Sequence, residues 1–100
     1  VRSRCGEYEL GAAQLELVLE LVDHTRNDPA VERPASIRSS IGIARLAAER
    51  SKRLGKAVDN TTLAEAAKLV LGQAILMKPG RSREKYLESL LVRVLGTAGA

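Results

Sequence analysis

The sequence RPASIRSSIGIARLAA, residues 33–48, decides the fold because a helix start is followed by a regular apolar repeat. Ser36 is a residue type that favours the N-cap position of a helix. After it, aliphatic side chains recur at intervals of three or four residues, which is typical of one helix face that packs against a core. The residues of this expected core stripe are Ile37, Ile41, Ala44 and Ala48.

A second face of the same helix carries Arg38, Gly42, Arg45 and Glu49. A glycine inside a helix costs about 1 kcal/mol relative to alanine, so Gly42 predicts the close approach of another body. Two arginines on either side of this bare backbone would suit an anionic ligand.

Three more helices are predicted around this one. The first covers residues 10–26 and ends at Asn27-Asp28-Pro29, because the residue before a proline avoids the helical region. The second helix runs from Ser36 to Leu54 and stops at Gly55. The first helix has an apolar face, which Leu15 and Leu19 widen. The residues of this face are Leu10, Gln14, Leu17, Val18, Leu21, Val22 and Thr25.

The third helix is expected to begin with the capping-box pattern Thr62-Leu63-Ala64-Glu65 and to reach Met77. It is apolar around almost its whole circumference, which is typical of a buried helix. The fourth helix is expected to start at Ser82, after Pro79-Gly80, and to end near Leu95. Its stripe consists of Leu87, Leu90, Leu91 and Val94.

These patterns predict one all-α domain, a four-helix bundle over residues 10–96, with the third helix central. Residues 1–9 are expected to be a tail or the remnant of a linker, and residues 97–100 a frayed end. The chain begins at Val1 without a signal peptide, so we expect it to be a piece of a longer protein. Tyr8 and Tyr86 are the only aromatic residues, and the core must therefore be aliphatic.

The net charge of +4 would suit an anionic partner, but charges of both signs are interspersed and the basic clusters are short. A solvated surface is therefore expected rather than a nucleic-acid interface. The apolar runs are far shorter than the ~20 residues that span a bilayer, so no membrane partner is expected. The single cysteine, Cys5, allows no internal disulfide, which fits a cytoplasmic location.

The sequence shows no catalytic set. His24 is expected to be a surface histidine near a helix end, Cys5 has no CxxC partner, and Ser39 and Ser40 lack the GxSxG context of a nucleophile. A Walker A loop, GxxxxGK[ST], is also missing. The chain by itself is therefore not expected to hydrolyse a nucleotide, and no metal site is expected.

Residues 17–29, LVLELVDHTRNDP, and residues 36–47, SIRSSIGIARLA, resemble the C-terminal lid of MoxR-type AAA+ ATPases. In that family a helix ending in Thr-Arg and a polar residue leads through a short loop to a Ser-Pro-Arg motif. An apolar helix with a second arginine follows. Gly55, residues 58–60 and a helix ending near Ile75 resemble the next part of the lid, so the likeness covers residues 14–78, with Ile37 in place of the motif's proline.

The resemblance implies that Arg38 is the sensor-2 arginine, which contacts nucleotide phosphate in the assembled ATPase. Arg45 and Ser36 are possible auxiliary residues. The implied cofactors are ATP and Mg²⁺, bound in the full-length protein rather than in this fragment. The implied partners are the chain's own N-terminal ATPase core and neighbouring subunits of a chaperone-like ring. The client protein and the number of subunits in the ring stay open. It also stays open whether Arg38 contacts the nucleotide of its own subunit or that of a neighbour.

Two other functions compete with this interpretation. Residues 36–54 and 62–77 could form a basic helix-turn-helix that binds DNA, although their connection is longer than the usual turn of about 3–4 residues. Alternatively, the chain could be an adaptor whose fourth helix binds another protein through Leu87, Leu90, Leu91 and Val94. This stripe more often closes a helix's own bundle.

Overall fold

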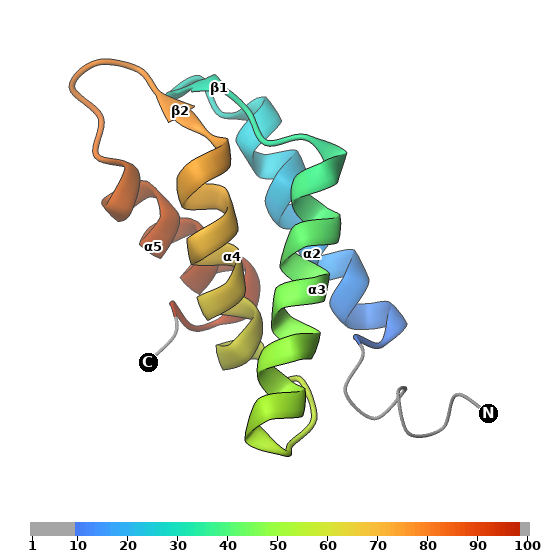
Figure 1. Cartoon of the computed structure of the whole chain (residues 1–100). Helices are drawn as coiled ribbons and strands as arrows, with labels where there is room; N and C mark the ends of the chain where they lie inside the picture. Colours follow the sequence, from blue (N-terminus) through green and yellow to red (C-terminus); the bar gives the residue numbers. More distant parts are fainter. Residues whose placement is uncertain (1–9, 99–100) are drawn as a thin grey trace.

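The computed structural model describes residues 10–98 of the chain. These residues fold into four helices and two short strands (Figure 1). The all-α fold is thus confirmed. Expectations for residues 1–9, including Cys5, and for residues 99–100 lie outside the described residues. In chain order the elements are α2 (Ala12–Asn27), β1 (Val31–Arg33), α3 (Ile37–Leu54), α4 (Asn60–Ala74), β2 (Leu76–Met77) and α5 (Arg83–Leu95).

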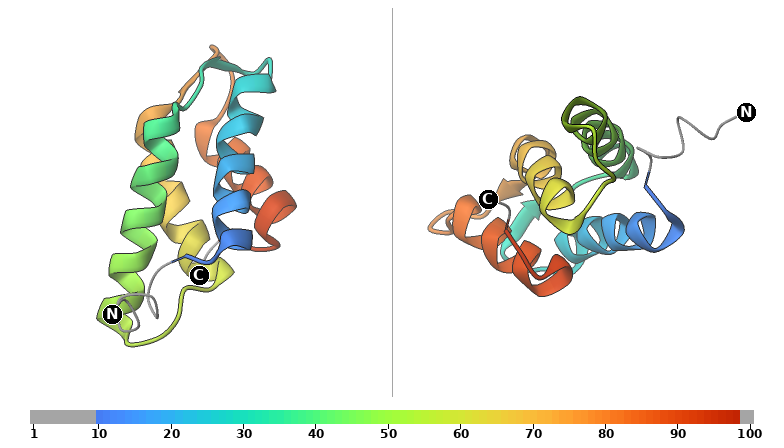
Figure 2. Two further views of the ribbon diagram at one scale, coloured as in Figure 1. Left: turned by 90° about the vertical axis from the view of Figure 1, so that its right-hand side faces the viewer. Right: turned by 90° about the horizontal axis from the view of Figure 1, so that it is seen from below.

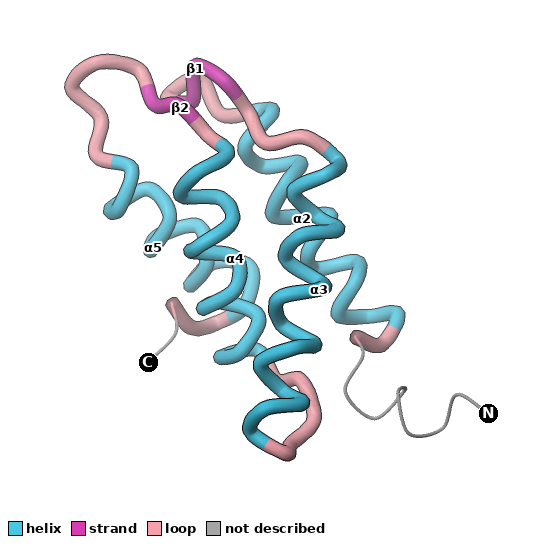
Figure 3. The backbone as a smooth tube through the Cα atoms, viewed as in Figure 1, coloured by secondary structure: helices cyan, strands magenta, loops and turns pink. Residues whose placement is uncertain are grey.

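The helices follow one another around a common core, and α2 closes the circle against α5 (Figure 2, right). The secondary-structure colouring in Figure 3 shows the strand pair across one end of this bundle. Helix α4 packs against both α3 and α5, but it is not buried around its whole circumference as expected. Its side chain Leu69 is 50% exposed, whereas the opposite face of α4 is buried. The largest fully buried aliphatic side chains are Leu21, Ile43, Leu63, Leu71, Leu90 and Leu91.

The expected core stripe of α3 was wrong in orientation. Ile37 is 58% exposed and Ile41 is 53% exposed. The buried face instead contains Ile43 and several small side chains, which allow neighbouring helices to come close. Serines are tolerated on this face where a hydroxyl finds a partner, as Ser40 does by donating to the carbonyl of Ile37. The buried residues of α3 are Ser39, Ser40, Ile43, Ala47 and Ser51.

Helix α3 has the expected ends. Ser36 occupies its N-cap position, and Gly55 follows its last turn with a φ of 70°, a left-handed conformation that glycine adopts without strain. The N–H of Gly55 donates to the carbonyl of Lys52 at 3.3 Å, which satisfies one of the free carbonyls at the helix end.

Helix α4 starts earlier than predicted. Asp59 is its N-cap, and Asp59 Oδ1 accepts hydrogen bonds from both the N–H and the hydroxyl of Thr62, each at 2.8 Å. These bonds, with the nearby Lys56 Nζ 3.6 Å from Asp59 Oδ2, lower the pKa of Asp59 below 3.8. The Thr62–Glu65 capping box is therefore not the helix start, because an aspartate three residues upstream caps the helix first.

Helix α4 also ends earlier than predicted, at Ala74, and Met77 lies in strand β2. This strand pairs antiparallel with β1, with Val31 opposite Met77. The N–H of Lys78 extends the pairing by donating to the carbonyl of Ala30 at 3.0 Å. The strand pair thus joins the segment that precedes α3 to the segment that follows α4.

Helix α5 agrees with its prediction. Ser82 caps it by accepting from the N–H of Lys85 at 3.3 Å, and Gly96 ends it in a left-handed conformation. Thr97 and Ala98 are half-buried, and Ala98 packs against the core, unlike a frayed end. Within residues 10–98 we find no helix that combines the length and the hydropathy needed to span a bilayer.

Candidate functional site

The segment that leads into α3 is held by Thr25, a threonine of α2 that is only 1% exposed. Its Oγ1 accepts a hydrogen bond from the N–H of Ala35 at 3.1 Å and donates to the carbonyl of Val22 at 2.7 Å. Ala35 is itself buried. This buried link fixes the backbone immediately before Ser36, and with it the direction in which α3 begins. The sequence assigned Thr25 to a buried face but did not indicate this contact.

Arg38, the expected sensor-2 residue, lies in the first turn of α3 and is exposed. Its guanidinium has no hydrogen bond or ion pair with any residue in 10–98. The side chain of Ser36 makes no capping hydrogen bond, so its hydroxyl is not engaged by the helix start. A cation here gains nothing from the helix dipole, which is positive at this end. Both side chains are therefore available for an external group.

Arg45 lies two turns further along the same side of α3 and is also exposed. Seven residues at 1.5 Å per residue separate the two arginines by about 10 Å along the helix axis. Glu49 lies one turn after Arg45, but the two do not form an ion pair among those of residues 10–98. The structure thus places Arg38 and Arg45 on one helix but does not bring them together at a single closed site.

Gly42 does not present bare backbone to a ligand. A Cβ atom at Gly42 would lie 3.6 Å from Cγ1 and 3.8 Å from Cγ2 of Val70, which are ordinary van der Waals distances. Gly42 is half-buried, and it faces α4 at the contact between the two helices. The close body that the glycine predicted is therefore the neighbouring helix of the same domain.

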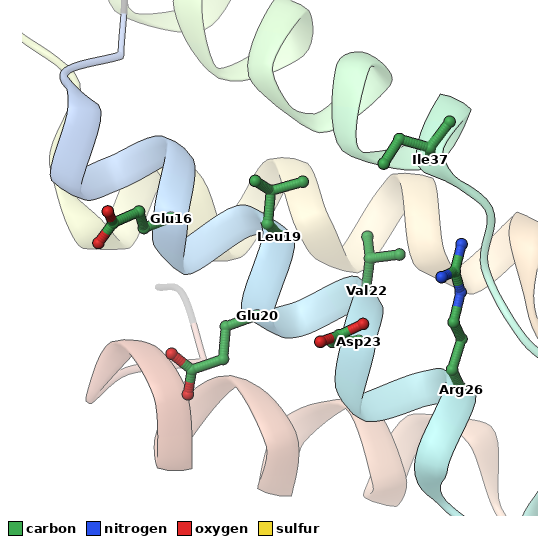
Figure 4. A pocket seen from close by; sticks show the side chains of 7 residues that line it. All are labelled: Glu16, Leu19, Glu20, Val22, Asp23, Arg26 and Ile37. Carbon is green, nitrogen blue, oxygen red and sulfur yellow. The ribbon is translucent and has the colours of Figure 1, made fainter.

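A shallow hollow of about 320 Å³ lies between α2 and the start of α3 (Figure 4). Leu19, Val22 and Ile37 form its apolar part, and Arg26 extends along one side. Three carboxylates on α2 complete the lining: Glu16, Glu20 and Asp23. A second hollow of about 280 Å³ lies further along the same two helices and is lined by Leu10, Leu15, Ala44, Arg45 and Ala48.

His24 lies on α2 with Nε2 3.6 Å from Glu20 Oε2, one turn away on the same helix. It is half-buried. No group of three or more His, Cys, Asp or Glu side chains within residues 10–98 is placed to hold a metal ion.

In the described part of the chain, two hydroxyls are buried without a hydrogen-bond partner, Ser51 Oγ and the hydroxyl of Tyr86. Burial raises the pKa of Tyr86 to about 12, with a further contribution from Asp28 and an opposing one from Arg93. No nucleophile or base accompanies either hydroxyl among the hydrogen bonds and ion pairs of residues 10–98, so we assign no chemistry to them.

The adaptor interpretation of α5 was wrong. Leu87, Leu90 and Leu91 are buried in the core and Val94 is half-buried, so this stripe closes the bundle. The helix-turn-helix interpretation gains no support either. One face of α4 is buried against the core, and Lys68 is the only basic side chain on the whole helix. A recognition helix needs several side chains that can reach base edges in the major groove.

Comparison with models of protein families, with curated proteins and with solved structures finds no match to this chain.

Proposed function

We propose that residues 10–98 form the sensor-2 lid of a MoxR-type AAA+ ATPase, in which Arg38 contacts nucleotide phosphate. The observation that carries the proposal is an exposed guanidinium, unpartnered within the described part of the chain, in the first turn of a helix whose start is anchored by Thr25. The resemblance of residues 14–78 to that lid supports the same assignment of Arg38.

The chemistry of the arginine suits this role. A guanidinium stays protonated at all physiological pH values, and its planar fork can bind two phosphate oxygens at once. In phosphoryl transfer such a group offsets the negative charge that develops on the transferred phosphate. ATP and Mg²⁺ would be bound mainly by the ATPase core, while Arg38 would supply one contact from the lid.

The auxiliary residues have different parts in this proposal. Ser36 lies at the N-cap with its hydroxyl unengaged by the helix, next to N–H groups that have no partner within the helix. It could donate a hydrogen bond to the same phosphate. Arg45 is about 10 Å away along the axis, so its contribution would be to the field around the anion rather than a shared bidentate contact.

The test uses the full-length chain, which the proposal requires to contain a Walker A loop and Walker B carboxylates upstream of Val1. Arg38→Ala should reduce ATP turnover by about tenfold or more, since removing an arginine from phosphoryl transfer has large effects. Arg38→Lys should restore only part of the rate, because an ammonium cannot form the two parallel bonds. Arg53→Ala, an exposed arginine at the other end of α3, is the matched control.

The melting temperature separates a functional role from a structural one. Arg38 is exposed and unpartnered within residues 10–98, so Arg38→Ala should melt within experimental error of the unmodified protein. Turnover that is unchanged in Arg38→Ala, or reduced equally in Arg53→Ala, would exclude Arg38 as the phosphate contact.

A further inference from the structure

Large aliphatic side chains are exposed in two adjacent rows on α2 and α3. Leu15 and Leu19 are one turn apart on α2, and Ile37 and Ile41 are one turn apart on α3. Leu19 and Ile37 line the same hollow, and Leu15 lines the next one with Ala44 and Ala48. We call this surface the α2–α3 face. Contiguous exposed apolar surface of this kind marks an interaction site.

The two edges of the α2–α3 face carry net charges of opposite sign, although Arg26 lies at the end of the mainly acidic α2 edge and Glu49 lies one turn beyond Arg45 on the α3 edge. Its α2 edge has three carboxylates in the hollow beside Leu19, those of Glu16, Glu20 and Asp23. Its α3 edge has Arg45, which lies beside Leu15 at the second hollow, and Arg38, seven residues earlier on the same side of the helix.

Helices α2 and α3 run in opposite directions (Figure 2, left). The end of α2 near Val22 is therefore level with the start of α3 at Ile37, and Leu15 is level with Ala44 and Arg45. Glu16, the neighbour of Leu15, thus lies at about the same height on the α2 edge as Arg45 does on the α3 edge.

We propose that the α2–α3 face binds the same face of a second copy of this chain, as a two-fold symmetric dimer. A two-fold axis parallel to the helices places α2 of each copy over α3 of the other while keeping each residue at its own height. The aliphatic rows then meet in the centre, and each Glu16 lies opposite an Arg45 of the other copy. An isologous interface requires this kind of self-complementary surface.

The charge pattern favours a second copy over other occupants. A uniformly basic segment would match the α2 edge and be repelled by Arg45, and a uniformly acidic segment would show the reverse. A second copy matches both edges at once. The inference does not depend on the proposed function, and its test leaves Arg38 unchanged.

The test measures dimerisation of the 100-residue chain by sedimentation equilibrium over a range from micromolar to millimolar concentration. Glu16→Arg places two cations opposite each other at the contact with Arg45, and Arg45→Glu places two carboxylates opposite each other at the contact with Glu16, so each variant alone should dimerise at least about tenfold more weakly. Mixing the two variants should restore association as a heterodimer, because both contacts between positions 16 and 45 then join opposite charges. Glu88→Arg, on the exposed side of α5, is the control for net charge.

The apolar centre has its own test. Ile41→Glu should abolish dimerisation, whereas Leu69→Glu, at a similarly exposed leucine on α4, should leave it unchanged. Circular dichroism should be the same for all variants, because every altered side chain is exposed. An unmodified chain that stays monomeric at millimolar concentration overturns the proposal, and so does a mixture of the two charge variants that fails to associate. Equal weakening by Glu88→Arg also overturns it.

Discussion

Replacing Gly42 with alanine should make this domain more stable. Gly42 lies in the interior of α3, where glycine pays a larger conformational entropy on folding than any other residue. The new methyl group would have room, since the nearest side-chain atom, Val70 Cγ1, lies at 3.6 Å. The perturbation thus adds helix propensity and a contact between α3 and α4 without requiring either helix to move.

The magnitude follows from two contributions. The change in helix propensity from glycine to alanine is about 0.8–1.0 kcal/mol. A fully buried methyl group adds about 0.8 kcal/mol, and because the site is half-buried we expect about half of that. The free energy of unfolding should therefore rise by about 1.2–1.4 kcal/mol, which in a domain of this size raises the melting temperature by about 5–11 °C.

The assay is urea and thermal unfolding followed by circular dichroism, with Gly55→Ala as the control. Gly55 has a φ of 70° and no atom within 4 Å of its added Cβ, so alanine there is strained by the backbone and gains no contact. It should lose about 1 kcal/mol. A Gly42→Ala protein that is less stable than the unmodified chain would refute the contact geometry between α3 and α4 described above.

Three other substitutions test the buried and capping groups. Asp59→Ala should cost about 1 kcal/mol, and the difference should disappear in acid, because a carboxylate with a lowered pKa loses its contribution as the pH falls through that value from 3.8 downward. Tyr86→Phe removes a buried hydroxyl without a partner and should be neutral or stabilising at pH 7. Because the pKa of Tyr86 is raised from 10.0 to about 12, the unmodified chain should lose stability relative to this variant as the pH rises through that window, in urea melts at each pH. Ser51→Ala should raise the melting temperature, and a fall would mean that the hydroxyl has a partner such as a bound water.

The helix boundaries that local chemistry determines could be predicted from the sequence. Ser36 and Gly55 bound α3 as expected, and Ser82 starts α5, because an N-cap residue and a left-handed glycine act within a single turn. The start of α4 was missed for a related reason. The capping-box pattern predicts a start at Thr62, whereas Asp59 caps the helix through a hydrogen bond from the N–H of Thr62, which only the structure shows.

The orientation of α3 could not be predicted from periodicity. Two stripes at helical spacing exist on this helix, one with Ile37 and Ile41 and one with Ser39, Ile43 and Ala47. The second is the buried one, since its small side chains permit close packing, and the adjacent Ser40 donates to the carbonyl of Ile37 within the helix. Apolar content alone favours the stripe with Ile37 and Ile41, and for this reason the sequence predicts a core position for a face that is exposed.

The candidate site was predictable in part. The position of Arg38 in the first turn of α3 followed from the cap at Ser36. Sequence spacing does not determine side-chain geometry. It therefore could not show that Arg38 lacks a partner within residues 10–98 or that Arg45 makes no ion pair with Glu49. The link from Thr25 to Ala35 joins two segments through tertiary contact and left no local signal.

The pairing of β1 with β2 has a consequence for the order in which the domain folds. Val31 and Met77 lie on either side of both α3 and α4 in the chain, so their pairing closes a long loop at a large entropic cost. Helices α3 and α4 are neighbours in sequence and pack against each other, and they can form before that cost is met. The strands should therefore form after the helical hairpin of α3 and α4.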